Sequence, residues 1–231
     1  MISRGLVALS LVAILALPAC RQRVATDGLA GYDACAAVDS LLRSAGPARP
    51  FALSGHARLD VEQFRFRGRF RWEGNDAGGT AIEFSGSTLF GGHREDVLVS
   101  LAEDTLRVFD RERGRFYEGA ALDDLIWDAT RARADWAAVV AQVFMVPRRC
   151  TAMSSVVFDA DGVRGLEGGE PFRMVLTRER RVDRATWPDP ARNGTFDDRL
   201  EIHYDWRDGA PREITASLPA RGWRLRLNDD K

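Results

Sequence analysis

The run from Phe64 to Trp72 alternates apolar or small residues with arginine without a break. Successive side chains of a β-strand point to opposite faces of the sheet, so this period of two predicts a strand with one apolar and one charged face. The apolar face carries the aromatic residues Phe64, Phe66, Phe70 and Trp72. The charged face carries Arg65, Arg67, Arg69 and Arg71. The apolar face must meet either a second layer of the protein or an apolar ligand, and the alternation leaves both open.

The same period of two recurs along most of the chain, interrupted by polar and glycine-containing turns. Six strands are expected in the first half, at Phe51–Val61, Phe64–Trp72, Thr80–Gly86, Asp96–Leu101, Thr105–Phe109 and Arg115–Glu118. Seven are expected in the second half, at Ser154–Phe158, Gly162–Glu167, Pro171–Thr177, Val182–Trp187, Leu200–Trp206, Glu213–Leu218 and Gly222–Asn228. Because most connections have hairpin length, the pattern predicts a mainly β (α+β) protein with an antiparallel sheet.

Two segments have helical periodicity instead. Asp33–Ser44 predicts a short leading helix, and Leu122–Val146 places apolar residues three and four apart along one face. Pro147 is expected to end this second segment. Ala132 and Arg133 interrupt its apolar stripe, so one long helix and two shorter helices with a bend are both compatible with the pattern.

The N-terminus has the pattern of an export signal. Arg4 precedes the apolar run Leu6–Leu17, which is too short to span a bilayer and has the length of a signal-peptide core, so residues 1–19 are expected to be removed. The run ends in a sequence that resembles the lipobox of bacterial lipoproteins, with its cysteine at Cys20. That resemblance implies lipidation of Cys20, and Arg21 in place of aspartate implies an outer-membrane location facing the periplasm. A plain secretory signal is the alternative.

Length and composition predict a single domain beyond this signal. The chain has 231 residues, of which 45% are hydrophobic, enough for one substantial core. Residues 20–31 are expected to form a lipid anchor and a tether without structure, and residues 32–231 the domain. In an exported protein the two remaining cysteines, Cys35 and Cys150, are expected to form a disulfide. Two buried free thiols are the alternative.

Motifs for catalysis, metal or nucleic acid are not expected to operate in this chain. The formal net charge of −1 argues against nucleic-acid binding. His56, His93 and His203 lack metal-ligand spacing. The segment Asp159–Gly162 begins like a calcium loop, but Arg164 stands where such a loop requires glycine, so a turn is expected. We therefore predict no catalytic residue, no metal site, no cofactor and no enzymatic activity.

The order of elements resembles that of the Lol-type (LolA/LolB-like) periplasmic carriers and outer-membrane lipoprotein receptor. The resemblance covers Phe51 to Leu227 and rests on the lipobox, a leading helix, consecutive strands, an inserted helix and closing strands. It includes a glycine-leucine-glycine corner at Gly86–Gly91 and the Leu218-Pro219 ending. The resemblance implies an incomplete, curved antiparallel β-barrel whose inserted helix acts as a plug or lid.

The resemblance also implies a carrier function without a cofactor. The expected protein is an outer-membrane-anchored lipoprotein that binds or transfers lipid or lipoprotein acyl chains, such as palmitate, in an apolar cavity. That cavity would be lined by Phe64, Phe66, Phe70, Trp72, Phe84, Val99, Leu101, Trp136, Val139, Val143, Phe144, Ile202, Tyr204 and Trp206. Leu89 and Phe90 would form a loop that touches the membrane. Ordinary core packing is the alternative for both sets.

The arginine face of Phe64–Trp72 has two interpretations of its own. It is either a solvated strand face whose arginines pair with acids such as Glu83, or a surface that collects phosphates or an acidic partner. The second interpretation supports an alternative function, a structural or assembly lipoprotein that binds an envelope protein through its polar face and carries no ligand.

Overall fold

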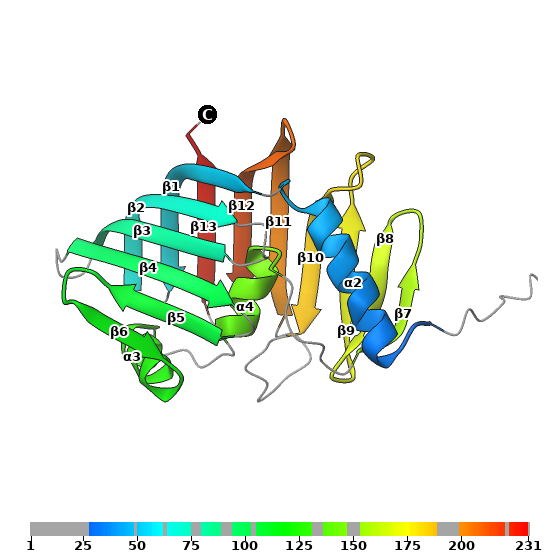
Figure 1. Cartoon of the computed structure of the whole chain (residues 1–231), viewed down its shortest axis with the longest axis horizontal. Coiled ribbons are helices and arrows are strands. Elements are labelled where there is room, and N and C mark those ends of the chain that lie inside the picture. Colours follow the sequence, from blue (N-terminus) through cyan, green and yellow to red (C-terminus); the bar gives the residue numbers. More distant parts are fainter. Residues whose placement is uncertain are drawn as a thin grey trace, which may run out of the picture.

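A single open antiparallel sheet makes up most of the molecule. The structure is a computed structural model that describes residues 28–48, 50–61, 64–74, 80–88, 94–102, 105–130, 136–146, 153–188, 199–219 and 222–230. Within these ranges thirteen strands join in one sheet whose two edges are β6 and β7. The sheet does not close on itself, so the predicted mainly β fold with an incomplete barrel is confirmed (Figure 1).

The first half of the chain contributes β1 (Phe51–Val61), β2 (Phe64–Gly74), β3 (Thr80–Thr88), β4 (Arg94–Ala102), β5 (Thr105–Asp110) and β6 (Arg115–Glu118). The second half contributes β7 (Met153–Phe158), β8 (Gly162–Glu167), β9 (Glu170–Leu176), β10 (Val182–Pro188), β11 (Arg199–Arg207), β12 (Ala210–Leu218) and β13 (Trp223–Asp229). The described helices are α2 (Gly31–Ala45), α3 (Ala120–Thr130) and α4 (Trp136–Val143). All thirteen predicted strands are present, several of them longer than predicted.

The sheet consists of two meanders joined by the first and last strands. Each strand pairs with its neighbour in sequence from β1 to β6 and again from β7 to β13, and β1 pairs with β13. The helices α3 and α4 lie in the connection between the two meanders. Figure 1 shows α4 in front of the middle of the sheet and α2 in front of its β7–β10 side. The face toward these two helices is called the inner face, and the opposite one the outer face.

One hydrophobic cluster fills the space between the inner face and the helices. Trp72, Tyr204 and Ile82 are its largest fully buried sheet residues, with at most 1% of each exposed. The helices add Val38 from α2 and Val139 from α4. Because residues from both meanders and from both helices belong to one cluster, burial of apolar surface stabilises the whole described fold as a unit.

A pair of glycines lets β2 and β3 approach closely on the inner face. Gly68 and Gly86 lie directly opposite each other in the register of these strands. A Cβ atom added to Gly68 would lie 2.2 Å from the carbonyl oxygen of Ser85, and one added to Gly86 would lie 2.3 Å from that of Arg67. Either position would also meet the ring of Phe66, at 2.7 and 2.8 Å. Glycine is therefore required here by space, and the aromatic ring covers the two bare backbones.

The predicted segment Leu122–Val146 contains two described helices, in agreement with the second of the two predicted alternatives, and α4 ends before Pro147. After α4 the chain makes a Schellman turn: the N–H of Val146 donates to the carbonyl of Ala141 at 2.8 Å, and Met145 has φ 50°. Methionine at this left-handed position is uncommon, because the conformation normally favours glycine. Pro147 therefore indicates the region of the stop, but no residue of the turn predicts the left-handed conformation at Met145.

The segment before α2 also differs from the prediction. Residues 20–31 were expected to need no structure, but Leu29 forms an antiparallel bridge with Val156 of the edge strand β7. The N–H of Leu29 donates to the Val156 carbonyl at 2.8 Å, and the reverse bond measures 2.9 Å. Gly31 already belongs to α2. The described fold therefore begins at the β7 edge, several residues earlier than predicted.

Candidate hydrophobic site

The inner face beneath α4 is organised around the indole of Trp72, which is completely buried. Its ring packs edge-on against Phe51 at 4.8 Å and against Phe144 at 5.0 Å between ring centroids. The indole N–H donates to the Thr80 hydroxyl at 2.7 Å, and that hydroxyl donates to the Glu73 carbonyl at 3.0 Å. The one polar atom of Trp72 is thus satisfied inside an apolar layer.

Helix α4 is buried over most of its circumference. Its buried residues are Trp136, Ala138, Val139, Ala141, Gln142 and Val143, and Ala137 and Val140 are half-buried. Such burial is typical of a helix in a core, whereas a surface helix has one polar face. The interruption at Ala132 and Arg133 falls outside the described residues, so no contact of theirs enters the site.

Tyr204 on β11 fixes the C-terminal end of α4. Its hydroxyl lies 3.0 Å from the carbonyl oxygen of Gln142 and 3.1 Å from that of Val143, and it donates to this pair. Both carbonyls are in the last turn of the helix, where they lack partners within the helix. Burial raises the pKa of Tyr204, so the phenol stays protonated and remains a donor.

The structure brings the predicted cavity residues together in the single hydrophobic cluster. Ten of them are buried: Phe66, Phe70, Trp72, Leu101, Trp136, Val139, Val143, Phe144, Ile202 and Tyr204. Three are half-buried and pack against the cluster: Phe84, Val99 and Trp206. The side chain of Phe64 lies outside the described part. The grouping agrees with either a binding surface or a core, so their role as a ligand cavity stays a prediction.

Residues outside the predicted set contribute to the same cluster. Ile82 is fully buried between Trp72 and Val99 in the sheet register, and alternation in its strand already pointed to this face. Trp223 on β13 lies 6.2 Å from Trp136 of α4 between ring centroids. No local signal pairs these two tryptophans, because their contact depends on how α4 crosses the sheet.

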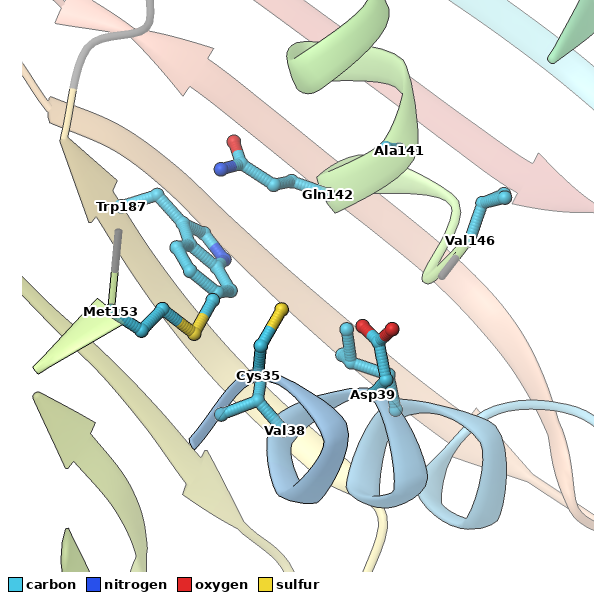
Figure 2. Close-up of a pocket in the computed structure, with 9 residues that line it drawn as sticks. Cys35, Val38, Asp39, Ala141, Gln142, Val146, Met153 and Trp187 are labelled. Atoms are coloured by element: carbon cyan, nitrogen blue, oxygen red, sulfur yellow. The ribbon is translucent and has the colours of Figure 1, made fainter. Parts of the chain in front are cut away.

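A small pocket lies between α2 and α4, away from the predicted set. It is lined by Cys35, Val38, Asp39, Leu42, Ala141, Gln142, Val146, Met153 and Trp187. Its volume is about 10 Å³ for the centre of a water-sized sphere, which is room for about one water molecule. The Gln142 side-chain oxygen is buried and has no hydrogen-bond partner among the described residues. Figure 2 shows the Gln142 amide and the Cys35 sulfur at this space between the helices.

The remaining predicted residues are distributed as follows. Cys35 is 2% exposed in the pocket wall. His56 and His203 are exposed on the outer face, and Asp159 accepts bonds from the N–H groups of Asp161 and Gly162 at 3.0 Å, which makes the predicted turn. Residues outside the described ranges are Cys20, Leu89, Phe90, His93 and Cys150. Among the residues that the structure describes, none gather three metal-ligating side chains at one point.

Three of the four arginines of β2 pair with acids, as predicted for a solvated strand face, but not with Glu83. Glu83 lies opposite Arg71 in the register, but it pairs with Arg111 from the turn after β5, and Arg71 pairs with Glu73 on its own strand. Long side chains on an exposed face can reach diagonal and same-strand partners, so the register alone does not fix ion pairs.

Within the described ranges, no helix combines the length and the apolar content needed to span a membrane.

Comparison with known proteins shows similarity of fold. No protein-family profile and no curated protein sequence matches the chain. A DUF1329 family protein from Desulfovibrio piger matches 87% of this chain and 90% of its own, with a TM-score of 0.50 and 8% identity. A LolA superfamily protein from Nitrosomonas europaea matches 85% of this chain and 91% of its own, with a TM-score of 0.46 and 10% identity. The chain is thus structurally similar to a LolA superfamily protein and to a DUF1329 family protein at low sequence identity, a likeness of architecture.

Proposed function

We propose that this protein is an envelope lipoprotein that binds a hydrophobic ligand, lipid or lipoprotein acyl chains, on the inner face of its sheet. The observation that carries the proposal is the position of α4, a mostly buried apolar helix that packs on the inner face of the sheet. The ring of Phe144, at the end of α4, covers Trp72 of the sheet, and the sheet aromatic residues form a surface that suits acyl chains once the helix moves. In this proposal α4 is a plug that the ligand displaces.

The polar contacts of α4 support displacement. Among the described residues, the hydroxyl of Tyr204 is the side-chain group that bonds its last carbonyls, while the Gln142 side-chain oxygen is buried without a partner. A buried unpaired amide oxygen costs roughly 1–3 kcal/mol, which weakens the closed arrangement. Burial of an acyl chain contributes about 0.8 kcal/mol per methylene, so a long chain can replace the lost helix contacts.

The anchoring proposal concerns the residues before the fold. We propose that residues 1–19 are removed, that Cys20 is lipidated and that residues 20–28 connect the lipid to the β7 edge at the outer membrane. Leu29, which bridges Val156, marks the end of this connection. Mass spectrometry of the protein from membranes should show an acylated N-terminal cysteine, and Cys20→Ala should release the protein into the soluble periplasmic fraction. An unmodified Cys20 would reject lipidation.

We also propose a disulfide between Cys35 and Cys150. Cys35 shares the pocket wall with Met153, only three residues after Cys150 in the chain. Three residues span at most roughly 10 Å, so the second cysteine is within reach of α2. The bond would tie the leading helix to the segment between α4 and β7.

Ligand binding is tested by titrating cis-parinaric acid, a fluorescent fatty acid, into protein that starts at residue 21. This protein contains every described element. We expect saturable fluorescence enhancement. Phe144→Ala should raise the affinity about tenfold, because loss of its ring contact with Trp72 destabilises the plugged state and increases the fraction open to ligand.

Phe172→Ala is the matched control. Phe172 on β9 is 3% exposed and stacks on Trp187 at 4.8 Å, so its removal costs comparable core packing away from the Trp72–Phe144 contact. It should lower thermal stability and leave affinity near that of the wild type. If neither wild type nor Phe144→Ala binds the probe saturably, the carrier proposal fails. If both variants change the affinity equally, α4 is not the plug.

A filled core favours a second candidate, a structural or assembly lipoprotein that binds an envelope protein. The contacts of Trp72 with Phe51 and Phe144 leave no gap at that point of the described core. In this case the polar outer face would carry the function. A salt-sensitive pulldown of an envelope protein, lost on exchange of Arg67 and Arg69 for Glu, would support it. Pulldown unaffected by that exchange would contradict it.

A further inference from the structure

The outer face of the central sheet concentrates arginine. Alternation along β1, β2 and β13 directs these side chains away from the hydrophobic cluster. They are Arg58, Arg65, Arg67, Arg69, Arg71, Arg224 and Arg226, all of them exposed. We call this set the arginine face. Sequence alternation identified the four on β2, and the pairing of β1 with both β2 and β13 adds the other three.

The register places like charges directly opposite one another. Arg58 on β1 lies opposite Arg226 on β13 and opposite Arg67 on β2, which makes a row of three arginines across three adjacent strands. Directly opposite residues have Cβ atoms about 4.5–5.5 Å apart, and like charges at this separation destabilise a sheet. Folding stability therefore gives no reason for this row.

Carboxylates neutralise only part of the arginine face. Asp60 bonds Arg58 at 2.6 Å and lies 3.8 Å from Arg65, and Glu213 lies 2.9 Å from Arg226. The other pairs are Arg69 with Asp230 and Arg71 with Glu73. Asp230 also faces His56 at 3.3 Å.

The two remaining arginines have no carboxylate partner within the described ranges. Arg67 and Arg224 make no ion pair with any residue that the structure describes. Among the described residues, four carboxylates pair with the seven guanidinium groups of the arginine face, so this set of side chains has a net positive charge.

An apolar row continues the same outer face toward the β6 edge. Arg71 lies opposite Glu83, and the register continues through Leu98 on β4 and Phe109 on β5 to Phe116 on β6. Leu98 and Phe109 are half-buried, and Phe116 is 59% exposed. Exposed aromatic residues beside a basic surface are typical of protein surfaces that lie in a membrane interface.

We propose that the arginine face and the neighbouring Leu98–Phe109–Phe116 row bind a membrane surface through its anionic phosphate headgroups. Guanidinium groups bind phosphate oxygens in a bidentate manner, and a row of them matches the many phosphates of a lipid surface. The apolar row favours lipid over an acidic protein, because it gives the acyl boundary a partner. The α4 side of the sheet then faces away from the membrane.

The geometry of the chain permits this orientation if Cys20 is lipidated. Six strand spacings separate β13 from the β7 edge, roughly 29 Å at about 4.8 Å per spacing. The eight residues from Cys20 to Gly28 span at most roughly 28 Å. A fully extended tether thus spans about the same distance, so a lipid at Cys20 can lie in the membrane beside the arginine face, although the charged surface itself requires neither lipidation nor a carried ligand.

The test is sedimentation of the protein from residue 21 with vesicles of phosphatidylglycerol mixed with phosphatidylcholine, against vesicles of phosphatidylcholine alone. We expect binding to the anionic vesicles that weakens as salt rises. Replacing the two unpaired arginines, Arg67→Gln with Arg224→Gln, should weaken binding about thirtyfold. Phe116→Ser should weaken it at low and high salt alike, because its contribution is apolar.

Arg178→Gln with Arg207→Gln is the charge-matched control, since both residues are exposed and lie outside the arginine face. This variant should weaken vesicle binding by less than about threefold, because charges far from the membrane contact are screened by salt. Equal binding to neutral and anionic vesicles, or equal weakening by both double variants, would overturn the proposal.

Binding to poly-glutamate without binding to vesicles would assign the face to an acidic protein instead. Both double variants should bind cis-parinaric acid like the wild type, which separates this proposal from the carrier function.

Discussion

At the scale of single residues, the hydroxyl of Thr80 decides whether the buried Trp72 has a polar partner. It accepts from the indole N–H and donates to the Glu73 carbonyl. Thr80→Val keeps the shape and removes the hydroxyl, so it should lower the free energy of unfolding by about 1–3 kcal/mol, the cost of an unsatisfied buried donor. Urea unfolding followed by tryptophan fluorescence measures this. Thr80→Ser keeps the hydroxyl and should recover most of the loss, and equal losses for both variants would contradict the explanation.

Asp110 at the β5–β6 turn links stability to pH. Burial by itself raises the pKa of this carboxyl, but bonds from the side chain and backbone N–H of Arg113, at 2.7 and 3.0 Å, outweigh it and lower the pKa. Because the folded-state pKa is lowered, ionised Asp110 stabilises the fold at pH values above its unfolded-state pKa of about 3.9. This stabilisation is lost as the pH falls through the folded-state pKa of Asp110.

Asp110→Asn should therefore cost about 1–2 kcal/mol near neutral pH and progressively less in acid. Chemical denaturation at about pH 7 and about pH 3 measures the difference. Asp161→Asn, at an exposed residue on the β7–β8 turn, serves as the control and should change little at either pH. A gap between wild type and Asp110→Asn that stays constant with pH would show that the charge is not responsible.

At the scale of elements, the Gly68–Gly86 pair sets the approach of β2 to β3. Gly68→Ala would place a Cβ 2.2 Å from a backbone carbonyl oxygen, which a side-chain movement cannot relieve. We expect a loss of about 3 kcal/mol or more in the free energy of unfolding. Gly114→Ala is the contrasting control: its φ of 62° is unfavourable for alanine but nothing lies within 4 Å, so about 1 kcal/mol is expected. Similar losses at the two sites would argue that space is not the limiting factor at Gly68.

Elements were predictable where local alternation carried the information. Phe64–Trp72 and Leu200–Trp206 alternate strictly, and both lie in strands close to the predicted bounds. Pro147 predicted the approximate end of α4, but not its geometry, which depends on Met145 in a left-handed conformation and on a phenol from distant β11. The sequence alone placed Leu29 in the tether, because its bridge partner Val156 is far along the chain and no local pattern indicates the contact.

The site was predictable to the same extent. Alternation placed Phe66, Phe70 and Trp72 on the buried face, because a period of two fixes the face once one residue is buried. The pocket between α2 and α4 was not predicted, since Val38 and Gln142 meet only through the tertiary packing of two helices. The row of Arg58 with Arg226 likewise required the pairing of β1 with β13, a contact between the two ends of the domain that no local pattern specifies.

At the scale of the whole molecule, the pairing of β1 with β13 joins the two meanders into one sheet. β1 and β13 are the first and last strands in the chain, so the central hydrogen-bonded contact closes the largest loop of the sheet. Closing a loop of this length costs chain entropy, and the free energy gained by burying apolar surface in the common core must exceed that cost. Features that hold the start of the domain to the later meander therefore contribute to the stability of the whole fold. Leu29 on β7 is one, and the proposed disulfide from Cys35 is another.

The proposed Cys35–Cys150 disulfide gives the prediction at this scale. It would close a loop of about 115 residues, for which the chain-entropy relation gives a stabilisation of roughly 4–5 kcal/mol. Reductant should therefore shift the urea midpoint of the wild-type protein downward, while Cys35→Ser with Cys150→Ser should unfold at the reduced midpoint under both conditions. Alkylation without reductant should label neither cysteine in the folded or the denatured protein. Labelling of both thiols after denaturation without reductant would instead identify them as buried free thiols, and the two meanders would then be held by β1–β13 pairing and core packing without a covalent link.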